Sequence, residues 1–491
     1  MNVQLTKNVT EFLRAPVRHF IDGGWKAGGA EAPVLNPSDG SRLATVGMGG
    51  AAEIDEAVSA AWKAFPAWSA LSPQERAAKL HRFAECLEKH SADLALLESL
   101  DVGKAITAAE GFDVPFGIEC LRYFADLSAQ AHYDVPLAVK NIEARTHRAP
   151  YGVCGFIFPW NFPFTLLLWG IAPALAAGNT VVVKPSEVTP LSSLFVAKLA
   201  EEAGMPAGVI NMVVGDGPSA GAALAGHPRI KRMSFTGSPE VGKKIGEMCG
   251  RNLVPCKLEL GGKGAAMVFD DVDVEATAQK LAGAITLNTG QVCCTATRWL
   301  VHEKIYDQFV EKAAQALKQT KIGPGTDRET QMGPVVSEVQ RQRISRYLEK
   351  GVEQGAELVL DGKTFGSAGG ERGFYVPPSL LAGSPENICC REEIFGPTAF
   401  LLKFKDETAG IRLVNQLSYG LANSVWSNDL KRAGRVAEQM VAGNSWINAH
   451  NVFGYGLPYG GVNLSGLGGG VNSPETFYDY LRPQTIARPL A

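Results

Sequence analysis

Hydrophobic and polar positions follow two different periods along this chain. Short runs of β-branched residues alternate with longer stretches in which apolar residues recur at helical spacing, a pattern typical of a parallel sheet covered by helices. After Tyr151 the pattern predicts strands at 153–158, 180–185, 209–214, 232–237 and 256–262, with helices at 165–177, 190–203, 219–225 and 239–248 between them. This order indicates a doubly wound, Rossmann-like nucleotide-binding domain.

A second series of alternating elements follows the first. It predicts helices at 275–287, 305–320, 337–351, 406–417 and 429–440, and strands at 299–301, 357–360 and 399–404. The expected fold class is therefore α/β with two Rossmann-like doubly wound domains, the first in 1–130 and 151–258 and the second in 259–465. The segments 131–150 and 470–491 fit neither series, and we expect them to form a small extension used for oligomerisation.

Composition argues against several classes of protein. The 491 residues carry 47 Lys and Arg against 50 Asp and Glu, a balance that disfavours a nucleic-acid partner or an anionic membrane. The longest apolar run, 162–178, contains Pro163 and Pro173 and predicts a buried helix rather than a membrane span. Nine cysteines without a CxxC pair favour neither a disulfide framework nor a zinc site, so we expect no metal and a reducing, cytoplasmic location.

Three residues stand where their side chains could take part in chemistry. Cys293 follows a loop rich in Asn, Gly and Gln, where a thiol is accessible; the alternative is an inert buried cysteine. Glu259 lies among apolar residues before two glycines, which suits a general base of raised pKa; the alternative is an ion-paired structural residue. Asn161, held between aromatic residues and prolines, suits an oxyanion donor; the alternative is a helix cap.

Seven sequence motifs occur together in a fixed order. They are PWNFP (159–163), VVVKPSE (181–187), MSFTGS (233–238), LELGGK (258–263), NTGQVC (288–293), EEIFGP (392–397) and LPYGGVNLSG (457–466). On these motifs the chain resembles the aldehyde dehydrogenase superfamily, of the NAD(P)-dependent hydrolytic type, over essentially its whole length. The resemblance implies that the first domain binds NAD and that the second is catalytic.

The resemblance also implies a role for each matched residue. Cys293 would be the nucleophile and Glu259 the base, with the oxyanion held by the Asn161 side chain and the Cys293 N–H. The residues implied in cofactor binding are Lys184 and Glu187 at the adenosine ribose, Gly237 and Ser238 at the pyrophosphate, Glu393 at the nicotinamide ribose, and Phe395 and Trp160 at the nicotinamide side. The residues implied in the aldehyde tunnel are Phe162, Leu166, Trp169, Phe453 and Tyr459.

The implied reaction is the oxidation of an aldehyde to its carboxylic acid with NAD, in preference to NADP. A thiohemiacetal and then a thioester form on Cys293, and water activated by Glu259 releases the acid. One alternative is a CoA-acylating enzyme, which does not need Glu259; another is betaine or an amino aldehyde as the substrate class. The tunnel residues favour an uncharged small-molecule aldehyde, and we expect a homodimer or homotetramer.

The chain departs from the family's usual pattern near its C-terminus. Asn463 stands where a lysine is frequent, and Gly469 and Gly470 replace a frequent Arg–Glu pair. Cys294, beside Cys293, either lines the pocket or forms a disulfide with Cys293 under oxidation. None of the eight histidines lies in a motif, so a Cys–His dyad has no support.

Overall fold

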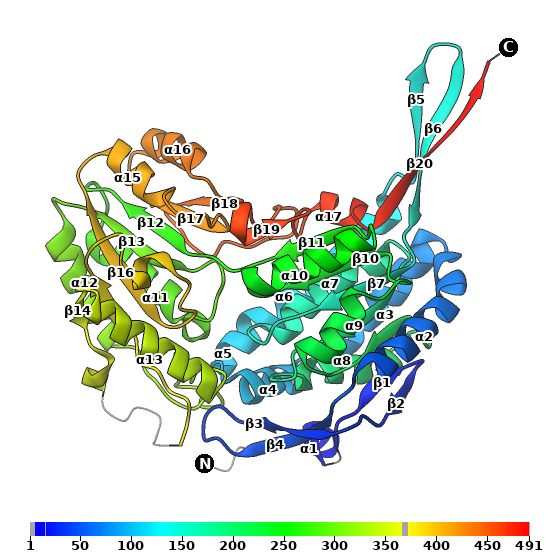
Figure 1. Ribbon diagram of the computed structural model, residues 1–491, viewed down its shortest axis with the longest axis horizontal. Coiled ribbons are helices and arrows are strands. Elements are labelled where there is room, and N and C mark those ends of the chain that lie inside the picture. The colour runs from blue at the N-terminus through cyan, green and yellow to red at the C-terminus, as the bar shows by residue number, and fades with distance from the viewer. Residues whose placement is uncertain (1–4, 15, 366–371, 491) are drawn as a thin grey trace.

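Two large sheets lie on opposite sides of the molecule, each covered by helices (Figure 1). The computed structural model describes residues 5–14, 16–365 and 372–490. A narrow antiparallel arm projects from the body beside the first sheet (Figure 1). In the described part of the chain, no helix is long and apolar enough to cross a membrane.

The first sheet has the strand order β19-β11-β10-β7-β8-β9-β1-β2, and its central strands, from β11 to β9, run parallel. These strands are buried because segments such as VCGFI and TVVVK carry apolar side chains on both faces. Each predicted strand is present but shorter than expected, and the Rossmann-like prediction is confirmed. The bounds are β1 (His19–Ile21), β2 (Gly24–Lys26), β7 (Val153–Ile157), β8 (Thr180–Lys184), β9 (Ile210–Met212), β10 (Arg232–Thr236), β11 (Cys256–Glu259) and β19 (Gly466–Leu467).

Helices before and between these strands complete the first unit. The apolar run 162–178 forms α7, a helix buried along nearly its whole length, so the prediction of a buried helix is confirmed. A small separate hairpin, β3 (Glu31–Leu35) with β4 (Arg42–Gly47), lies near the N-terminus. The helices are α1 (Lys7–Leu13), α2 (Ala51–Ser69), α3 (Pro73–Lys89), α4 (Ser91–Val102), α5 (Ile106–Ala108), α6 (Val114–Gln130), α7 (Pro163–Ala176), α8 (Leu191–Glu202), α9 (Ala222–Ala225) and α10 (Pro239–Arg251).

The second sheet has the order β14-β15-β16-β13-β12-β17-β18, parallel except for β14 against β15. Sequence periodicity missed β12, β15, β17 and β18, because segments such as GAAMV and NSWI are small or polar and carry little strand signal. The strands are β12 (Gly264–Val268), β13 (Ala296–His302), β14 (Glu357–Leu360), β15 (Ser379–Ala382), β16 (Thr398–Phe404), β17 (Ala422–Trp426) and β18 (Asn444–Ile447). The helices are α11 (Val274–Thr286), α12 (Tyr306–Lys318), α13 (Glu338–Glu353), α14 (Ile388–Arg391), α15 (Glu407–Val414) and α16 (Leu430–Gln439).

The arm joins two segments that are far apart in the sequence. Strands β5 (Asp134–Val139) and β6 (Ile142–Pro150) form a hairpin, and β20 (Leu481–Pro489) pairs with β6 along its whole length. Between the second sheet and β20, the short helix α17 (Pro474–Tyr478) packs on the body, where Phe477 and Tyr480 are buried. The arm therefore begins at residue 481 on its C-terminal side.

Candidate active site

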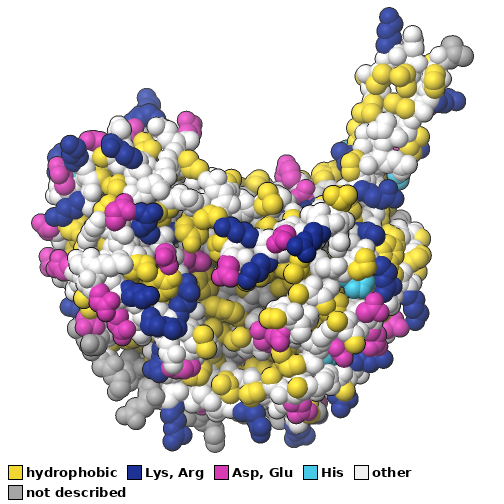
Figure 2. All heavy atoms as spheres, viewed as in Figure 1, with side chains coloured by type: hydrophobic (Ala, Val, Ile, Leu, Met, Phe, Trp, Pro, Cys, Tyr) yellow, Lys and Arg dark blue, Asp and Glu magenta, His cyan; other side chains and the backbone are white. Residues whose placement is uncertain are grey.

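A cavity of about 310 Å³ lies where the carboxyl edge of the first sheet faces the loop that leads into β13. The strand order places β7 next to β10, which is the topological switch point where open α/β sheets bind ligands. The segments that leave these two strands, 158–162 and 236–238, both line the cavity. Figure 2 shows a hollow between the two lobes with apolar side chains inside it.

Cys293 lies at the cavity wall in a loop that its neighbours hold rigid. Asn288 and Thr289 adopt left-handed backbone conformations, and the buried Gln291 side chain donates to the Asn288 carbonyl (3.1 Å) and accepts from the Val336 N–H (2.9 Å). Position 262 must be glycine, since a Cβ there would stand 2.3 Å from the Cys293 carbonyl oxygen. Cys293 is half-buried and lines the cavity, so the alternative of an inert, enclosed cysteine is not supported.

The environment of the Cys293 thiol favours its protonated form. The adjacent Cys294 thiol and burial raise the pKa of Cys293 well above its ordinary value. Its Sγ lies 3.6 Å from the hydroxyl of Tyr459. Cys294 also lines the cavity, as one of the two alternatives had it, and its thiol donates to Asn451 Oδ1 (3.4 Å).

His450 lies close to the cysteine pair without forming a dyad with Cys293. Burial lowers its pKa to about 4, so the ring is neutral and Nε2–H donates to the Cys294 carbonyl (2.8 Å). The Ser424 hydroxyl donates to Nδ1 (2.9 Å), so both ring nitrogens are engaged away from the Cys293 sulfur.

Glu259 is the last residue of β11, and its carboxylate faces the cavity. It is 7% exposed, and within the described residues neither carboxylate oxygen has a hydrogen-bond partner. Among the residues that the structure describes, Glu259 is therefore not in a hydrogen-bonded ion pair, so the structure does not support the alternative of an ion-paired structural glutamate. Burial raises the pKa of this carboxyl group well above its ordinary value, and the nearby Lys257 opposes that rise.

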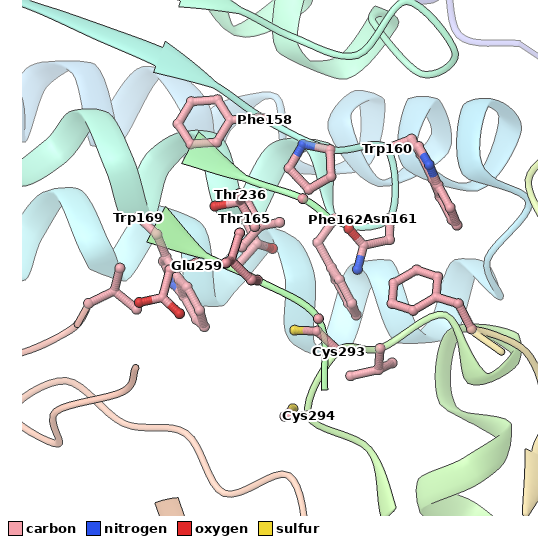
Figure 3. Close-up of a pocket in the computed structure, with 18 of the residues that line it drawn as sticks. Phe158, Trp160, Asn161, Phe162, Thr165, Trp169, Thr236, Glu259, Cys293 and Cys294 are labelled. Atoms are coloured by element: carbon pink, nitrogen blue, oxygen red, sulfur yellow. The ribbon is translucent and has the colours of Figure 1, made fainter. Parts of the chain in front are cut away.

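Asn161 is held on both its backbone and its side chain. Its Nδ2 donates to the Gln291 carbonyl (3.0 Å), and its own carbonyl accepts from Asn288 Nδ2 (2.8 Å). The helix-cap alternative is wrong, because α7 is capped by Phe162 without any side-chain bond. Figure 3 shows the Asn161 amide directed toward Cys293, with Glu259 across the cavity.

The other residues expected at the cofactor include groups suited to an anion and to a ribose. Ser238 caps α10 by accepting from the Val241 N–H (3.3 Å), so the positive end of this helix opens on the cavity beside Gly237. Glu393 accepts from the Gly262 N–H (2.8 Å), and burial raises its pKa to about 7. Trp160 and Phe395 also line the cavity and pack edge to face, with ring centroids 5.2 Å apart.

Lys184 and Glu187 lie at the end of β8, outside the set of residues that lines the cavity in the described part of the chain. The Lys184 amine donates to Glu187 (3.0 Å) and to the carbonyls of Pro185 (3.0 Å) and Gly215 (2.8 Å). Lys184 is buried, whereas the Glu187 side chain is 37% exposed. The pair thus forms a fixed lysine with an accessible carboxylate at the edge of the sheet.

The expected tunnel residues come together around Phe453. Its ring centroid lies 6.0 Å from Trp169 and 5.4 Å from Tyr459, while Phe112, which the sequence did not indicate, adds a ring at 5.9 Å. All five expected residues line the cavity: Phe162, Leu166, Trp169, Phe453 and Tyr459. Arg298 does not reach this tunnel, because it is buried and donates to the carbonyls of Lys263, Leu413 and Val414.

The sequence analysis did not predict the two basic residues of the cavity, Lys257 and Arg343, or its glutamine, Gln340. Lys257 lines it from β11, and the two-residue spacing from Glu259 was an available signal, since i and i+2 share one face of a strand. Gln340 and Arg343 reach it from α13, where they donate to the carbonyls of Phe395 (2.7 Å) and Glu393 (2.8 Å). No local motif marks these two residues, and only the packing of α13 brings them here.

Fold and cavity together define a Rossmann-like α/β protein whose cleft carries a thiol and a carboxylate. Residues 25–486 match the profile of the aldehyde dehydrogenase family. The chain is 38% identical to phenylacetaldehyde dehydrogenase of Pseudomonas fluorescens (93% of each chain) and 40% identical to mitochondrial benzaldehyde dehydrogenase of Antirrhinum majus (91% of this chain, 84% of that one). An NAD+ complex of aldehyde dehydrogenase from Bacillus cereus superposes over 100% of both chains with a TM-score of 0.96 and 35% identity. The protein belongs to the aldehyde dehydrogenase family and is an oxidoreductase that acts on aldehydes.

Proposed function

We propose that the protein oxidises an uncharged aldehyde to its carboxylic acid with NAD and water. One observation carries this proposal: the Cys293 thiol and the unpartnered Glu259 carboxylate face a single cavity at the carboxyl edge of a Rossmann-like sheet. A thiol supplies a nucleophile for the carbonyl carbon, and a buried carboxylate supplies a base for water.

The residues of the chain divide the reaction into two stages. Cys293 releases its thiol proton to water, and its sulfur bonds to the aldehyde carbon, leaving a negative oxygen that Asn161 Nδ2 and the Cys293 N–H stabilise. NAD, when bound, supplies the hydride acceptor that turns this adduct into a thioester. Glu259 then takes a proton from water as its oxygen attacks the thioester carbon. The carbon–sulfur bond breaks, which frees the acid and restores the Cys293 thiolate.

The cofactor side of the cavity suits a dinucleotide. The N-terminus of α10, with Gly237 and Ser238, would take the pyrophosphate, and Lys184 with Glu187 the adenosine ribose. Glu393 would hold the nicotinamide ribose, with Phe395 and Trp160 at the nicotinamide side. Gln340 and Arg343 extend this wall. NAD complexes among solved relatives support the assignment.

We expect NAD to be preferred over NADP. The exposed carboxylate of Glu187 can accept a hydrogen bond from a ribose 2′-hydroxyl but repels a 2′-phosphate. The ratio of kcat/KM values for the two cofactors should favour NAD at least about ten-fold, equivalent to about 1.4 kcal/mol. Glu187→Gln should bring the ratio of kcat/KM values for NAD and NADP closer to one, because it raises kcat/KM for NADP. A higher kcat/KM for NADP with the unaltered protein would refute the assignment.

The tunnel supports an uncharged substrate because neither cation that lines the cavity is among the aromatic residues around Phe453: Lys257 lies on β11 with Glu259, and Arg343 donates to the Glu393 carbonyl on the cofactor side. The buried Lys104 amine lies 4.4 Å from the centre of the Phe162 ring, but it pairs with Glu98 (2.9 Å) and Asp113 (3.1 Å) and is not among the residues that line the cavity in the described part of the chain. The aromatic rings around Phe453 offer apolar surface without a partner for a carboxylate. The relatives that act on benzaldehyde and phenylacetaldehyde support an aromatic substrate.

A panel of aldehydes tests this substrate class. We expect benzaldehyde, phenylacetaldehyde and hexanal to give the highest kcat/KM, because burial of their apolar groups stabilises the complex. Succinic semialdehyde should be slower by about 100-fold or more, since burying its carboxylate unpaired costs several kcal/mol. Betaine aldehyde should fall between them, because aromatic rings attract a quaternary ammonium at about 1–2 kcal/mol. If succinic semialdehyde gave the highest value, the assignment of an uncharged substrate would be wrong.

The same panel separates hydrolysis from acyl transfer to CoA. The presence of Glu259 in the cavity favours water as the acyl acceptor. With benzaldehyde, the product should be benzoic acid at the same rate with and without CoA. Formation of benzoyl-CoA in place of the acid would support the alternative reaction.

We also propose that the arm mediates homo-oligomerisation, as a dimer or tetramer. Strands β5, β6 and β20 project from the body and carry exposed apolar residues, namely Leu137, Val139, Ile142 and Ile486 (Figure 1). Apolar side chains on a projecting sheet gain stability when a second copy covers them. The nine cysteines, all within the described residues, are free thiols, which fits a cytoplasmic location.

A further inference from the structure

Lys257 is a buried lysine on the same strand as Glu259, and the reaction described above leaves it without a role. One residue separates the two on β11, so their side chains project from the same face of the sheet. Both line the cavity that contains Cys293, and Lys257 is only 1% exposed. A charged group buried this deeply needs an opposite charge nearby.

The charges around Lys257 leave Glu259 as its counterpart. Arg232 on β10 and Asp479 after α17 form an ion pair (3.7 Å) and so balance each other. The remaining pair of opposite charges is Lys257 and Glu259. The other titratable groups that face this pair stay neutral at pH 7, because their pKa values are raised. Burial raises the pKa values of Cys120, Tyr459 and Tyr480. The adjacent Cys294 thiol and burial raise the pKa of Cys293.

The Lys257 and Glu259 side chains share the cavity but are not hydrogen-bonded to each other. The Lys257 amine donates to the Gly470 carbonyl (3.4 Å), and within the described residues both Glu259 oxygens are without a hydrogen-bond partner.

We propose that Lys257 is a positioning residue for Glu259, whose ammonium group keeps the buried carboxylate in the ionised form that accepts a proton from water. The inference rests on the proposed role of Glu259 as the base. Burial lowers the pKa of Lys257 to about 8, so the ammonium form predominates at neutral pH. Burial raises the pKa of Glu259, and Lys257 acts against this effect. Without the ammonium, Glu259 would hold a proton at a higher pH and lose its function as a base.

Lys257→Met tests the proposal, because methionine keeps most of the volume and removes the charge. The burst of NADH formation and the steady-state turnover are measured with benzaldehyde and NAD over a range of pH. Turnover requires ionised Glu259, so it falls as the pH drops through the pKa of that group. In Lys257→Met this fall should begin about one to three pH units higher. At a fixed pH below both pKa values, turnover should be about ten-fold lower for each pH unit by which the fall moves, while the burst rate stays within about two-fold.

Two further variants separate the charge from packing. Lys257→Arg keeps the charge, so the pH at which turnover falls on the acidic side should stay within about half a pH unit of its value in the unaltered protein. In a Glu259→Gln background, Lys257→Met should have no further effect on the pH profile of turnover, because the group it acts on is gone. Thermal unfolding of each variant checks that the fold is retained.

Three outcomes would overturn the proposal. In the first, turnover falls at the same acidic pH in Lys257→Met as in the unaltered protein. In the second, Lys257→Arg moves the pH of this fall as far as Lys257→Met does. The third is a loss of turnover in Lys257→Met that is uniform over pH, which would indicate packing alone. Full turnover in Glu259→Gln by itself would instead refute the base assignment, so the two failures are distinguishable.

Discussion

Cys293→Ala should abolish aldehyde oxidation, with kcat falling at least about 10⁴-fold, because it removes the thiol that bonds to the aldehyde carbon, and the neighbouring Cys294 thiol is already hydrogen-bonded to Asn451 Oδ1. The substitution removes one sulfur from a half-buried position at the cavity wall, so folding and NAD binding should be retained. The measurements are NADH absorbance with benzaldehyde, NAD binding by calorimetry, and the thermal unfolding midpoint.

Cys294→Ala is the matched control for this variant. It removes the neighbouring thiol and its bond to Asn451 but leaves the Cys293 sulfur in place, so kcat should change less than about ten-fold. Because the Cys294 thiol contributes to the raised pKa of Cys293, the variant also shows how far that thiol raises the pKa of the Cys293 nucleophile. Comparable activity in Cys293→Ala and the unaltered protein would contradict the assignment.

Glu259→Gln should separate the two stages of the reaction. The amide has the shape of the carboxylate but cannot accept a proton from water, so the thioester should form and then accumulate. Rapid mixing with NAD and benzaldehyde should give a burst of about one NADH per active site, followed by turnover slower by about 10²–10⁴-fold.

The burst is the decisive part of that experiment. If it disappeared in Glu259→Gln, the carboxylate would be acting before hydride transfer, as the base that deprotonates Cys293. A steady-state rate equal to that of the unaltered protein would show that another group activates water. Glu259→Asp offers a control, since it keeps the charge but withdraws it from the cavity and should give an intermediate rate.

Local sequence patterns were sufficient to predict a strand where that strand is buried on both faces of its sheet. The runs at 153–157 and 180–184 are apolar throughout, and both are central strands. The capping pattern at Ser72 and Glu75 likewise marks the start of α3, where the two side chains satisfy each other's backbone N–H groups. In such segments the local preference and the tertiary environment agree.

Segments whose sequence gives only a weak strand pattern form strands because neighbouring strands pair with them. The strand β17 has the sequence ANSVW, whose polar residues are buried because β12 and β18 supply hydrogen bonds on either side. Gln340 and Arg343 illustrate the same limit in the site: they lie on a helix about 50 residues after Cys293, and no pattern links them to the cavity.

The sequence by itself determined the alternating α/β order, the position of the thiol, amide and carboxylate at the ends of predicted elements, and the resemblance carried by seven motifs. These are local properties, set by side-chain periodicity and by residue types at turns. Only the tertiary structure decided that, among the described residues, Glu259 has no hydrogen-bond partner, that Asn161 does not cap α7, and that Lys257 shares the cavity with Glu259. Each of these depends on which side chains from distant segments share one buried volume, because desolvation and Coulomb interactions are set by distance in space and not by distance along the chain.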